Sequence, residues 1–203
     1  MSENKSNKPK IEYGRKILNA GTLLAPLPAV MVSCGSMEKP NVLTIEGTGI
    51  INTKPPMTYI SVRPTRHSYG IIKESGEFVI NLTTSKMDRH TYFCGVNSGT
   101  DPEKIRKCGL HIEPASAVSA PVISESPLSL ECRVVEIKPL GSHDMFIAEI
   151  IAVNVDGRYI DSKGKINLNQ AGLMAYSHGE YFSLGRKLGS FGYSVAKRSS
   201  KKK

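Results

Sequence analysis

The chain has 203 residues, with 27 Lys and Arg against 18 Asp and Glu, which gives a formal net charge of +9. This length favours a single domain that buries roughly 70% of its unfolded surface without disulfide or metal cross-links. Hydrophobic residues make up 39% of the chain, which excludes wholesale disorder. A run of about 18 apolar residues, long enough to cross a membrane, is absent from the sequence.

The positive charge lies mostly at the two ends of the sequence. Residues 1–10 carry a net charge of +2 and residues 197–203 a net charge of +5, which leaves +2 for everything between them. We expect polar disordered tails at 1–12 and 196–203 around one domain at 13–195. Weak contact with a polyanion is the alternative use of the tails, and we expect no specific nucleic-acid partner.

The N-terminus and the cysteines favour the cytoplasm. The apolar stretch at 21–32 lies too far from the N-terminus for a secretory signal and contains two prolines. The four cysteines show neither CxxC nor Cys/His ligand spacing, which predicts no metal site and mostly buried, reduced thiols. They are Cys34, Cys94, Cys108 and Cys132.

Short segments rich in β-branched residues and bounded by Gly or Pro predict strands. In chain order they span residues 29–35, 41–47, 57–64 and 77–82. Two longer alternating segments, 129–140 and 144–156, flank the turn at Gly141 and predict a β-hairpin.

Helical signals are fewer and short. We expect one helix after Pro64, capped by Thr65 and running to Lys73. Two more are expected at 85–95 and 101–109. Strands and helices do not alternate regularly, so a β-rich barrel with helical insertions fits better than a doubly wound sheet.

Familiar catalytic motifs are missing. The sequence contains no GxGxxG after a strand, no phosphate-binding GxxxxGK[ST] loop, no HExxH and no GxSxG. Its aspartates are scattered and give no carboxylate pair. Redox chemistry in this chain would therefore need a bound cofactor.

The densest polar cluster spans residues 61–69, where a predicted strand ends and a helix begins. Arg63 and Arg66 flank Pro64 and Thr65, and Arg can hold a phosphate through two parallel hydrogen bonds. A helix N-terminus adds free N–H groups and partial positive charge. These residues predict a phosphate site; a solvated strand end with a capped helix is the alternative.

A second polar set follows Ser33 and consists of Asn41 and Thr44. Residues i and i+3 of a strand point to opposite faces, so both can line one pocket only if the chain bends. Turn chemistry is the alternative explanation.

Several segments together resemble the flavin reductase-like family of FMN-binding split β-barrels, which includes flavoredoxin. They read TLLAPLPAVMVSCG, NVLT, PPMTYISVRPTRHSYGIIKESGEFVINL, CGVNSG, LEC and LGSHDMFIAEI. The resemblance covers about residues 21–193 and implies a mainly β fold with short helices, a six-stranded Greek-key barrel. It also implies a homodimer and non-covalent FMN near the subunit interface.

The resemblance implies a role for each matched position. Wall residues of the flavin ring and ribityl chain would be Ser33, Asn41, Thr44 and Ile45, and the strand end passing the ring would be Ser61, Val62 and Arg63. The phosphate would lie at Arg66, His67 and Ser68, with Asn81, Ser98, Gly99 and Lys104 completing the cofactor site.

One position departs from the family pattern. Relatives often read N-x-x-T-x-x-W, but this chain reads NVLTIEG, so that Gly47 stands where the aromatic residue would be and Glu46 lies beside it. We expect a roomier active site and a carboxylate that disfavours the anionic reduced flavin.

Three further residues match the family at single positions. His143, in the LGSHD turn, corresponds to a histidine near the flavin or nicotinamide and would deliver a proton; a surface turn residue is the alternative. Tyr176 and Tyr181 either pack in the core or contact the flavin.

The sequence therefore predicts an FMN-binding oxidoreductase that takes electrons from NAD(P)H or from a redox protein. One alternative is a non-enzymatic electron-transfer protein of the flavoredoxin type. The other is a binding protein that uses its basic tails and keeps flavin as a sensor or relic.

Overall fold

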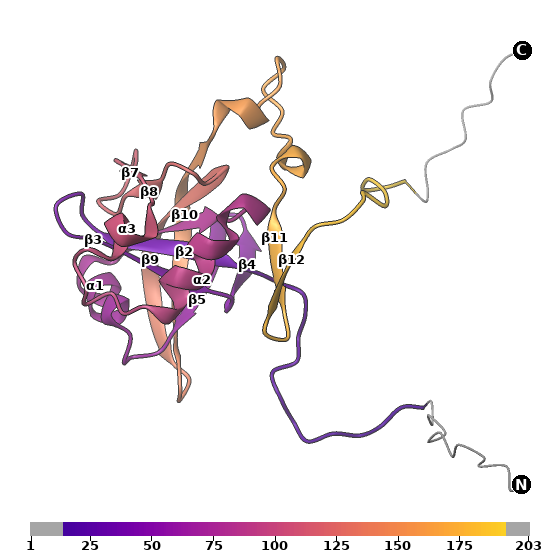
Figure 1. The fold of residues 1–203 in the computed structure, drawn as a ribbon, viewed down its shortest axis with the longest axis horizontal. Coiled ribbons are helices and arrows are strands. Elements are labelled where there is room, and N and C mark those ends of the chain that lie inside the picture. The colour runs from indigo at the N-terminus through magenta and orange to yellow at the C-terminus, as the bar shows by residue number, and fades with distance from the viewer. Residues whose placement is uncertain (1–13, 194–203) are drawn as a thin grey trace, which may run out of the picture.

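A computed structural model describes residues 14–193 of the chain. Its central element is a seven-stranded antiparallel sheet with the strand order β3-β2-β6-β9-β10-β5-β4 (Figure 1). The strands are β2 (Val30–Gly35), β3 (Pro40–Ile45), β4 (Thr48–Thr53), β5 (Pro56–Val62), β6 (Glu77–Leu82), β9 (Leu128–Pro139) and β10 (Asp144–Val155).

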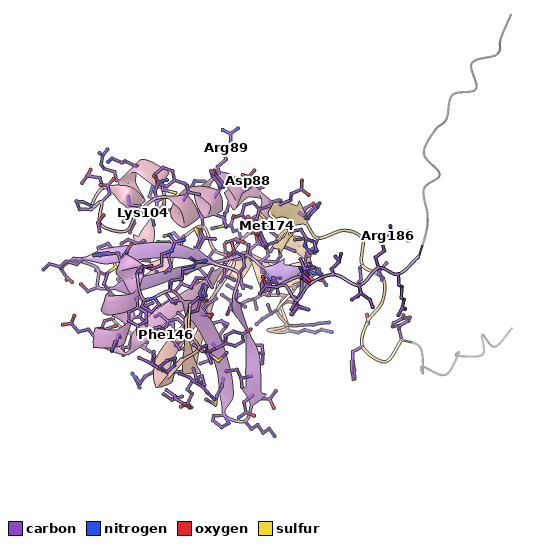
Figure 2. All side chains as sticks on the ribbon, turned by 90° about the horizontal axis from the view of Figure 1, so that it is seen from below. Asp88, Arg89, Lys104, Phe146, Met174 and Arg186 are labelled. Atoms are coloured by element: carbon purple, nitrogen blue, oxygen red, sulfur yellow. The ribbon has the colours of Figure 1, made fainter. Side chains whose placement is uncertain are left out.

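The long hairpin β9–β10, which the alternating sequence predicts, lies in the middle of this sheet. Its register shifts between Ile147 and Ala148 and again between Ile150 and Ala152. Such irregularities bend and twist a strand pair. The concave side holds the main core, in which Phe78, Phe146 and Ile60 are fully buried, and Figure 2 shows Phe146 inside the body.

The sheet curls until β3 and β5 approach each other without pairing in the described part of the chain. The mainly β fold with short helices is confirmed, but this sheet is open and has seven strands, where a six-stranded barrel was expected. The extra edge strand is β4, which pairs with β5 from Thr48↔Ile60 to Thr53↔Pro56. Four of its six residues are β-branched, but the glycine and the two adjacent isoleucines leave no alternation of apolar and polar positions.

Four short helical segments cover the β2–β3 side of the sheet (Figure 1). They are α1 (His67–Ser75), the 3₁₀ turn η1 (Ser85–Met87), α2 (Asp88–Val96) and α3 (Lys104–Cys108). Both α1 and α3 end at a glycine with positive φ, 68° at Gly76 and 75° at Gly109. The expected cap Thr65 was wrong: Arg66 holds the N-cap position of α1, without a side-chain cap.

The remaining elements are small. A three-stranded sheet joins β1 (Leu27–Pro28) to the hairpin β11 (Met174–Ser177) and β12 (Glu180–Ser183). A second hairpin consists of β7 (Ile112–Glu113) and β8 (Val122–Ile123), and two 3₁₀ turns follow, η2 (Gly157–Tyr159) and η3 (Leu168–Gln170).

The first and last described segments lead away from the body (Figure 1). The predicted tails at 1–12 and 196–203 fall outside the described residues. Over residues 14–193, no helix combines the length and the apolar run that crossing a bilayer requires. All four cysteines are free, and only Cys108 is partly exposed.

Candidate functional site

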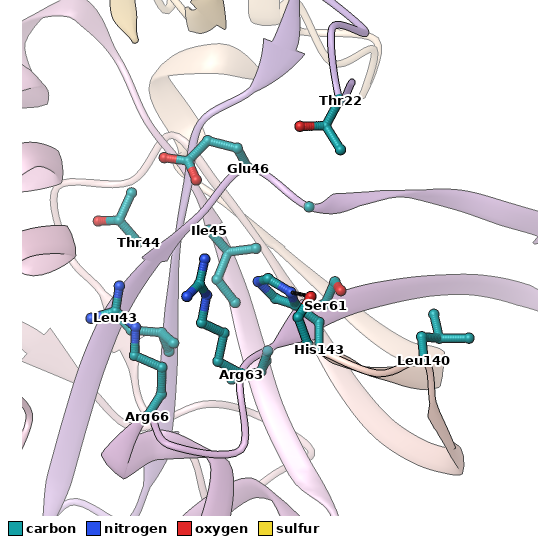
Figure 3. Close-up of a pocket in the computed structure, with 13 residues that line it drawn as sticks. Thr22, Leu43, Thr44, Ile45, Glu46, Ser61, Arg63, Arg66, Leu140 and His143 are labelled. Atoms are coloured by element: carbon teal, nitrogen blue, oxygen red, sulfur yellow. Dashed lines mark hydrogen bonds between the residues drawn. The ribbon is translucent and has the colours of Figure 1, made fainter. Parts of the chain in front are cut away.

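The approach of β3 to β5 leaves a cavity of about 460 Å³ between them (Figure 3). One wall is the end of β3 with the following turn, and the other is the end of β5. The turn between β9 and β10 closes one side. The lining residues are Thr22, Leu43, Thr44, Ile45, Glu46, Gly47, Ser61, Val62, Arg63, Arg66, Leu140, Ser142 and His143. We call this cavity the wide end of the groove.

A second cavity of about 160 Å³ adjoins the first and shares Leu43 and Arg66 with it. It lies where α1 begins, opposite the loop that follows α2. Its other lining residues are Thr65, His67, Ser68, Cys94, Val96, Asn97, Ser98, Gly99 and Lys104. We call it the narrow end, and the two cavities together the groove.

The narrow end gathers groups that can hold an anion. Arg66 stands at the N-cap of α1, and no side chain caps the helix, so its first N–H groups remain available. Among residues 14–193, neither Arg63 nor Arg66 forms a salt bridge with an acidic side chain. Arg66 lines the narrow end beside the helix N-terminus, and Arg63 lines the adjoining wide end. Together they give this part of the groove a positive potential that suits a phosphate.

Lys104 forms the floor of the narrow end. Its side chain is almost fully buried, and its ammonium group donates to the carbonyl oxygens of Val42 at 2.7 Å and Cys94 at 2.9 Å. Burial lowers the pKa of Lys104 from its usual value. The residue therefore ties α2 and α3 to β3 while it contributes positive charge below the anion seat. Figure 2 shows its position under the helices.

Asn41 and Gly99 shape the narrow end from behind. The Asn41 amide donates to the Ser68 hydroxyl at 3.2 Å and thereby orients it. Gly99 packs so closely that a Cβ added there would lie 2.3 Å from the Asn41 amide nitrogen. A larger residue at this position would have to displace the Asn41 amide.

The wide end offers both main-chain and acid–base groups. The N–H of Ser61 donates to the carbonyl of Gly47 at 2.8 Å, which joins the two walls at one end. The Nδ1 of His143 lies 3.0 Å from the Ser142 hydroxyl. Burial raises the pKa of the Glu46 carboxyl above its usual value, although the positive charge of Arg66 partly offsets this.

The structure brings most of the sequence-predicted residues to the groove. They are Thr44, Ile45, Ser61, Val62, Arg63, Arg66, His67, Ser68, Ser98, Gly99, Lys104 and His143. Thr44 also anchors β3 to α2, because its hydroxyl donates to the Thr91 carbonyl at 2.5 Å. Asn41 lies on the opposite face of β3, as its spacing from Thr44 predicts.

Besides Asn41, two more predicted residues lie outside the groove. Ser33 and Asn81 are fully buried, and the Asn81 amide donates to the Ser33 hydroxyl at 2.9 Å. The Oδ1 of the Asn81 side chain accepts from the N–H of Ile123 and the hydroxyl of Ser129. The pair belongs to a buried polar network that connects β2, β6, β8 and β9, and we leave it out of the proposed site.

Sequence analysis missed four residues that line the wide end, Thr22, Leu43, Leu140 and Ser142, and three that line the narrow end, Cys94, Val96 and Asn97. Thr22 precedes the first strand, and Leu140 and Ser142 occupy the β9–β10 turn. The only signal is that each lies inside a segment that resembles the family. Tyr176 and Tyr181 pack against each other with ring centroids 5.7 Å apart and do not line the groove.

Comparison with known proteins agrees with this geometry. Residues 23–185 match the family described as Flavin reductase like domain. An uncharacterised protein of Archaeoglobus fulgidus is 30% identical over 168 residues, which cover 83% of this chain and 93% of that protein. An NADH-dependent FMN reductase of Streptomyces nodosus subsp. asukaensis is 26% identical over 142 residues, 68% of this chain and 74% of that enzyme.

Solved structures give the same result. The structure of flavoredoxin of Desulfovibrio vulgaris (Miyazaki F) superposes with a TM-score of 0.82 at 27% identity, covering 90% of this chain and 100% of that one. Flavoredoxin from Methanosarcina acetivorans gives 0.80 at 25% identity, with 90% and 100% coverage. The chain belongs to the flavin reductase-like family.

Proposed function

We propose that the groove binds FMN non-covalently, with the phosphate at the narrow end and the isoalloxazine ring at the wide end. The observation that carries this proposal is the continuity of the two cavities through Leu43 and Arg66. An anion seat with unpaired arginines opens directly into a larger cavity with a partly apolar lining. The names of similar proteins, which include FMN reductases and flavoredoxins, support the same cofactor.

The residues of the groove suit the parts of this cofactor. Arg66 and the start of α1, with the hydroxyls of Ser68 and Ser98, would hold the phosphate. Ile45 and Val62 would supply apolar contact to the ring, and the main chain of Ser61 would run along it. Bound flavin supplies the hydride and electron chemistry, whereas the chain binds it, orients it and shields one side from water.

We assign His143 a role in proton transfer at the wide end. It lies on the turn that closes the cavity. Its Nδ1 lies within hydrogen-bond distance of the Ser142 hydroxyl, and this contact orients the imidazole (Figure 3). A change in flavin oxidation state changes the number of bound protons, so a histidine at this edge can donate or accept one.

The proposed reaction is the transfer of electrons from NAD(P)H to flavin. The second candidate is a non-enzymatic electron carrier, which the likeness to flavoredoxin favours. Purified protein should show the yellow colour and visible absorbance of flavin. NAD(P)H oxidation with and without added FMN then separates the candidates: a reductase oxidises the nicotinamide, whereas a carrier retains FMN without measurable oxidation. Absence of flavin binding in any condition would contradict both.

We also propose that the chain forms a homodimer. Large apolar side chains stand exposed on the segments that leave the body, with Ile17 at 101%, Leu188 at 89% and Phe191 at 110% relative exposure. A second subunit would remove this apolar surface from water. Light scattering coupled to size exclusion should give a mass of two chains, and a monomer at all concentrations would contradict this.

The free thiols support a cytoplasmic location.

A further inference from the structure

The position of His143 depends on the turn between β9 and β10, which also carries Leu140 (Figure 3). The N–H of Leu140 donates to the carbonyl of His143 at 3.0 Å and closes this turn. Among residues 14–193, the only hydrogen-bond partner of the His143 imidazole is Ser142, which belongs to the same turn. The imidazole is therefore fixed relative to the groove only if the turn itself is held to the body.

Asp144 ties the turn to the rest of the molecule. It directly follows His143 as the first residue of β10, and it pairs with Val62 at the end of β5. Its side chain is buried, and its Oδ2 accepts the Tyr69 hydroxyl of α1 at 2.6 Å. This hydrogen bond raises the pKa of Tyr69, which keeps the hydroxyl protonated and therefore a donor. Hydrogen bonds to a carboxylate are stronger than those between neutral groups.

The ring of Tyr69 is itself held in place. It packs edge-on against Phe146, with the ring centroids 5.2 Å apart and the planes at 80°. Phe146 is fully buried in the main core and lies on β10 two residues after Asp144. The ammonium group of Lys73, one helical turn further along α1, lies 5.9 Å from the centroid of the Tyr69 ring. Asp144 therefore has a hydrogen-bond donor whose position is set by packing.

From this arrangement we propose that Tyr69 is a positioning residue for His143. Its hydrogen bond to Asp144 fixes the β9–β10 turn and with it the place of the imidazole at the wide end. The proposal rests on the proposed role of His143 in proton transfer. Tyr69 lines neither cavity of the groove, so it acts through Asp144 and the turn. A proton donor or acceptor must lie within hydrogen-bond reach of the reacting atom, so a displaced turn slows the transfer.

Three variants test the proposal. Tyr69→Phe removes the hydroxyl but keeps the ring that packs on Phe146. Asp144→Asn keeps a side-chain oxygen that can accept from Tyr69, so it serves as the conservative rescue variant. Tyr92→Phe is the matched control, because Tyr92 is exposed on α2 and lies outside the groove.

The first measurement needs no flavin. The imidazole Cε1–H resonance of His143 in an NMR spectrum of the full chain is identified by its loss in His143→Ala. We expect this resonance to shift and broaden in Tyr69→Phe, while that of His111, paired with Glu125, keeps its position. Asp144→Asn should keep the resonance narrow, and Tyr92→Phe should leave it unchanged. An unchanged His143 resonance in Tyr69→Phe would overturn the proposal.

The second measurement separates positioning from a general loss of stability. In NAD(P)H oxidation, Tyr69→Phe should lower kcat about tenfold, part of the contribution of a positioned acid or base, and change FMN affinity by less than about twofold. In the His143→Ala background the same substitution should lower kcat no further, because the imidazole that it positions is gone. Equal loss of kcat in both backgrounds, or loss of FMN affinity alone, would overturn the proposal.

Failure of the proposed function gives a different result. Wild type that binds no flavin, or binds it without oxidising NAD(P)H, defeats the proposed reaction. The His143 resonance of the flavin-free chain decides in that case as well whether Tyr69 fixes the turn.

Discussion

Gly47 and Ser61 lie directly against each other at the edge of the wide end. The Gly47 carbonyl accepts the N–H of Ser61 at 2.8 Å, and a Cβ added to Gly47 would come 3.1 Å from the Cβ of Ser61. The sequence predicts extra space where relatives have an aromatic residue. A side chain at position 47 would point toward Ser61 of β5, so this strand fills the space that an aromatic residue would need. The glycine thus permits a close approach between the two walls of the groove.

A methyl group at position 47 should therefore disturb the groove. In Gly47→Ala the new Cβ would lie 3.1 Å from the Cβ of Ser61, so Ser61 must give way by a few tenths of an ångström. We expect the free energy of unfolding to fall by about 1–3 kcal/mol, as in other overpacked sites, and FMN affinity to fall with it. Chemical denaturation and flavin titration measure both.

The matched control for this substitution is Gly157→Ala, because a Cβ added to Gly157 meets no atom within 4 Å. It should match wild type in both measurements. Equal behaviour of the Gly47 and Gly157 variants would show that the contact with Ser61 does not restrict the site.

Glu46 predicts a pH-dependent difference in stability. Because burial raises its pKa, the folded chain holds this proton more tightly than the unfolded chain. Glu46 therefore contributes to the free energy of unfolding at low pH. This contribution is lost as the pH rises from the pKa of Glu46 in the unfolded chain through its pKa in the folded chain. The Tm of Glu46→Gln relative to wild type should therefore increase from about pH 4 to about pH 7. A constant Tm difference would contradict the assignment.

The same substitution should raise the reduction potential of bound flavin. Glu46 lines the wide end, and its negative charge opposes an anionic reduced flavin. Glu180→Gln, on β12 and exposed, removes an equal charge outside the groove and serves as the control for both measurements. Equal potentials in wild type and Glu46→Gln would place the carboxylate too far from the ring to matter.

His143→Ala separates proton transfer from cofactor binding. We expect NAD(P)H-dependent turnover to fall by about a hundredfold, the usual contribution of a positioned acid or base, with FMN affinity unchanged. Steady-state kinetics across the pH range would show the loss of one ionisation. His111→Ala, which removes an exposed histidine paired with Glu125, should retain wild-type turnover. An unchanged pH profile in His143→Ala would leave the residue as a turn residue only.

Lys104 should stabilise the fold as well as the anion seat. Lys104→Met removes the ammonium group and with it the hydrogen bonds to the buried carbonyls of Val42 and Cys94. We expect the free energy of unfolding to fall by about 2–4 kcal/mol, since buried acceptors left unpaired are costly. Lys107→Met, on the same helix, breaks only an exposed ion pair with Asp101 and should cost less than about 1 kcal/mol. Similar losses in the two variants would contradict the structural role.

The strands with β-branched sequences could be predicted because their signal is local. Residues 77–82 form β6 as expected, and the long hairpin matches within one residue at each end. The strand β4 was missed although it is rich in β-branched residues, because its adjacent Ile50 and Ile51 and its glycine break the alternation of apolar and polar positions. It exists because β5 offers it a pairing partner.

The positive charge at the narrow end could also be predicted from sequence, because Arg66 and the start of α1 fall within residues 61–69. The other walls come from segments more than 100 residues apart, Thr22 and Leu140 among them, which only the curl of the sheet brings together. Ser33 and Asn81 show the opposite case: a family position can hold a polar residue that serves the core.

The central claim is that Arg66 and the start of α1 hold the phosphate of FMN. The most direct measurement compares the affinities of FMN and riboflavin, which lacks the phosphate, in wild type, Arg66→Ala and Arg89→Ala. Arg89 is exposed on α2 and lies outside the groove (Figure 2). We predict that Arg66→Ala weakens FMN binding by about tenfold to a hundredfold and leaves riboflavin unchanged, while Arg89→Ala changes neither. Equal affinity of wild type for FMN and riboflavin would contradict the claim.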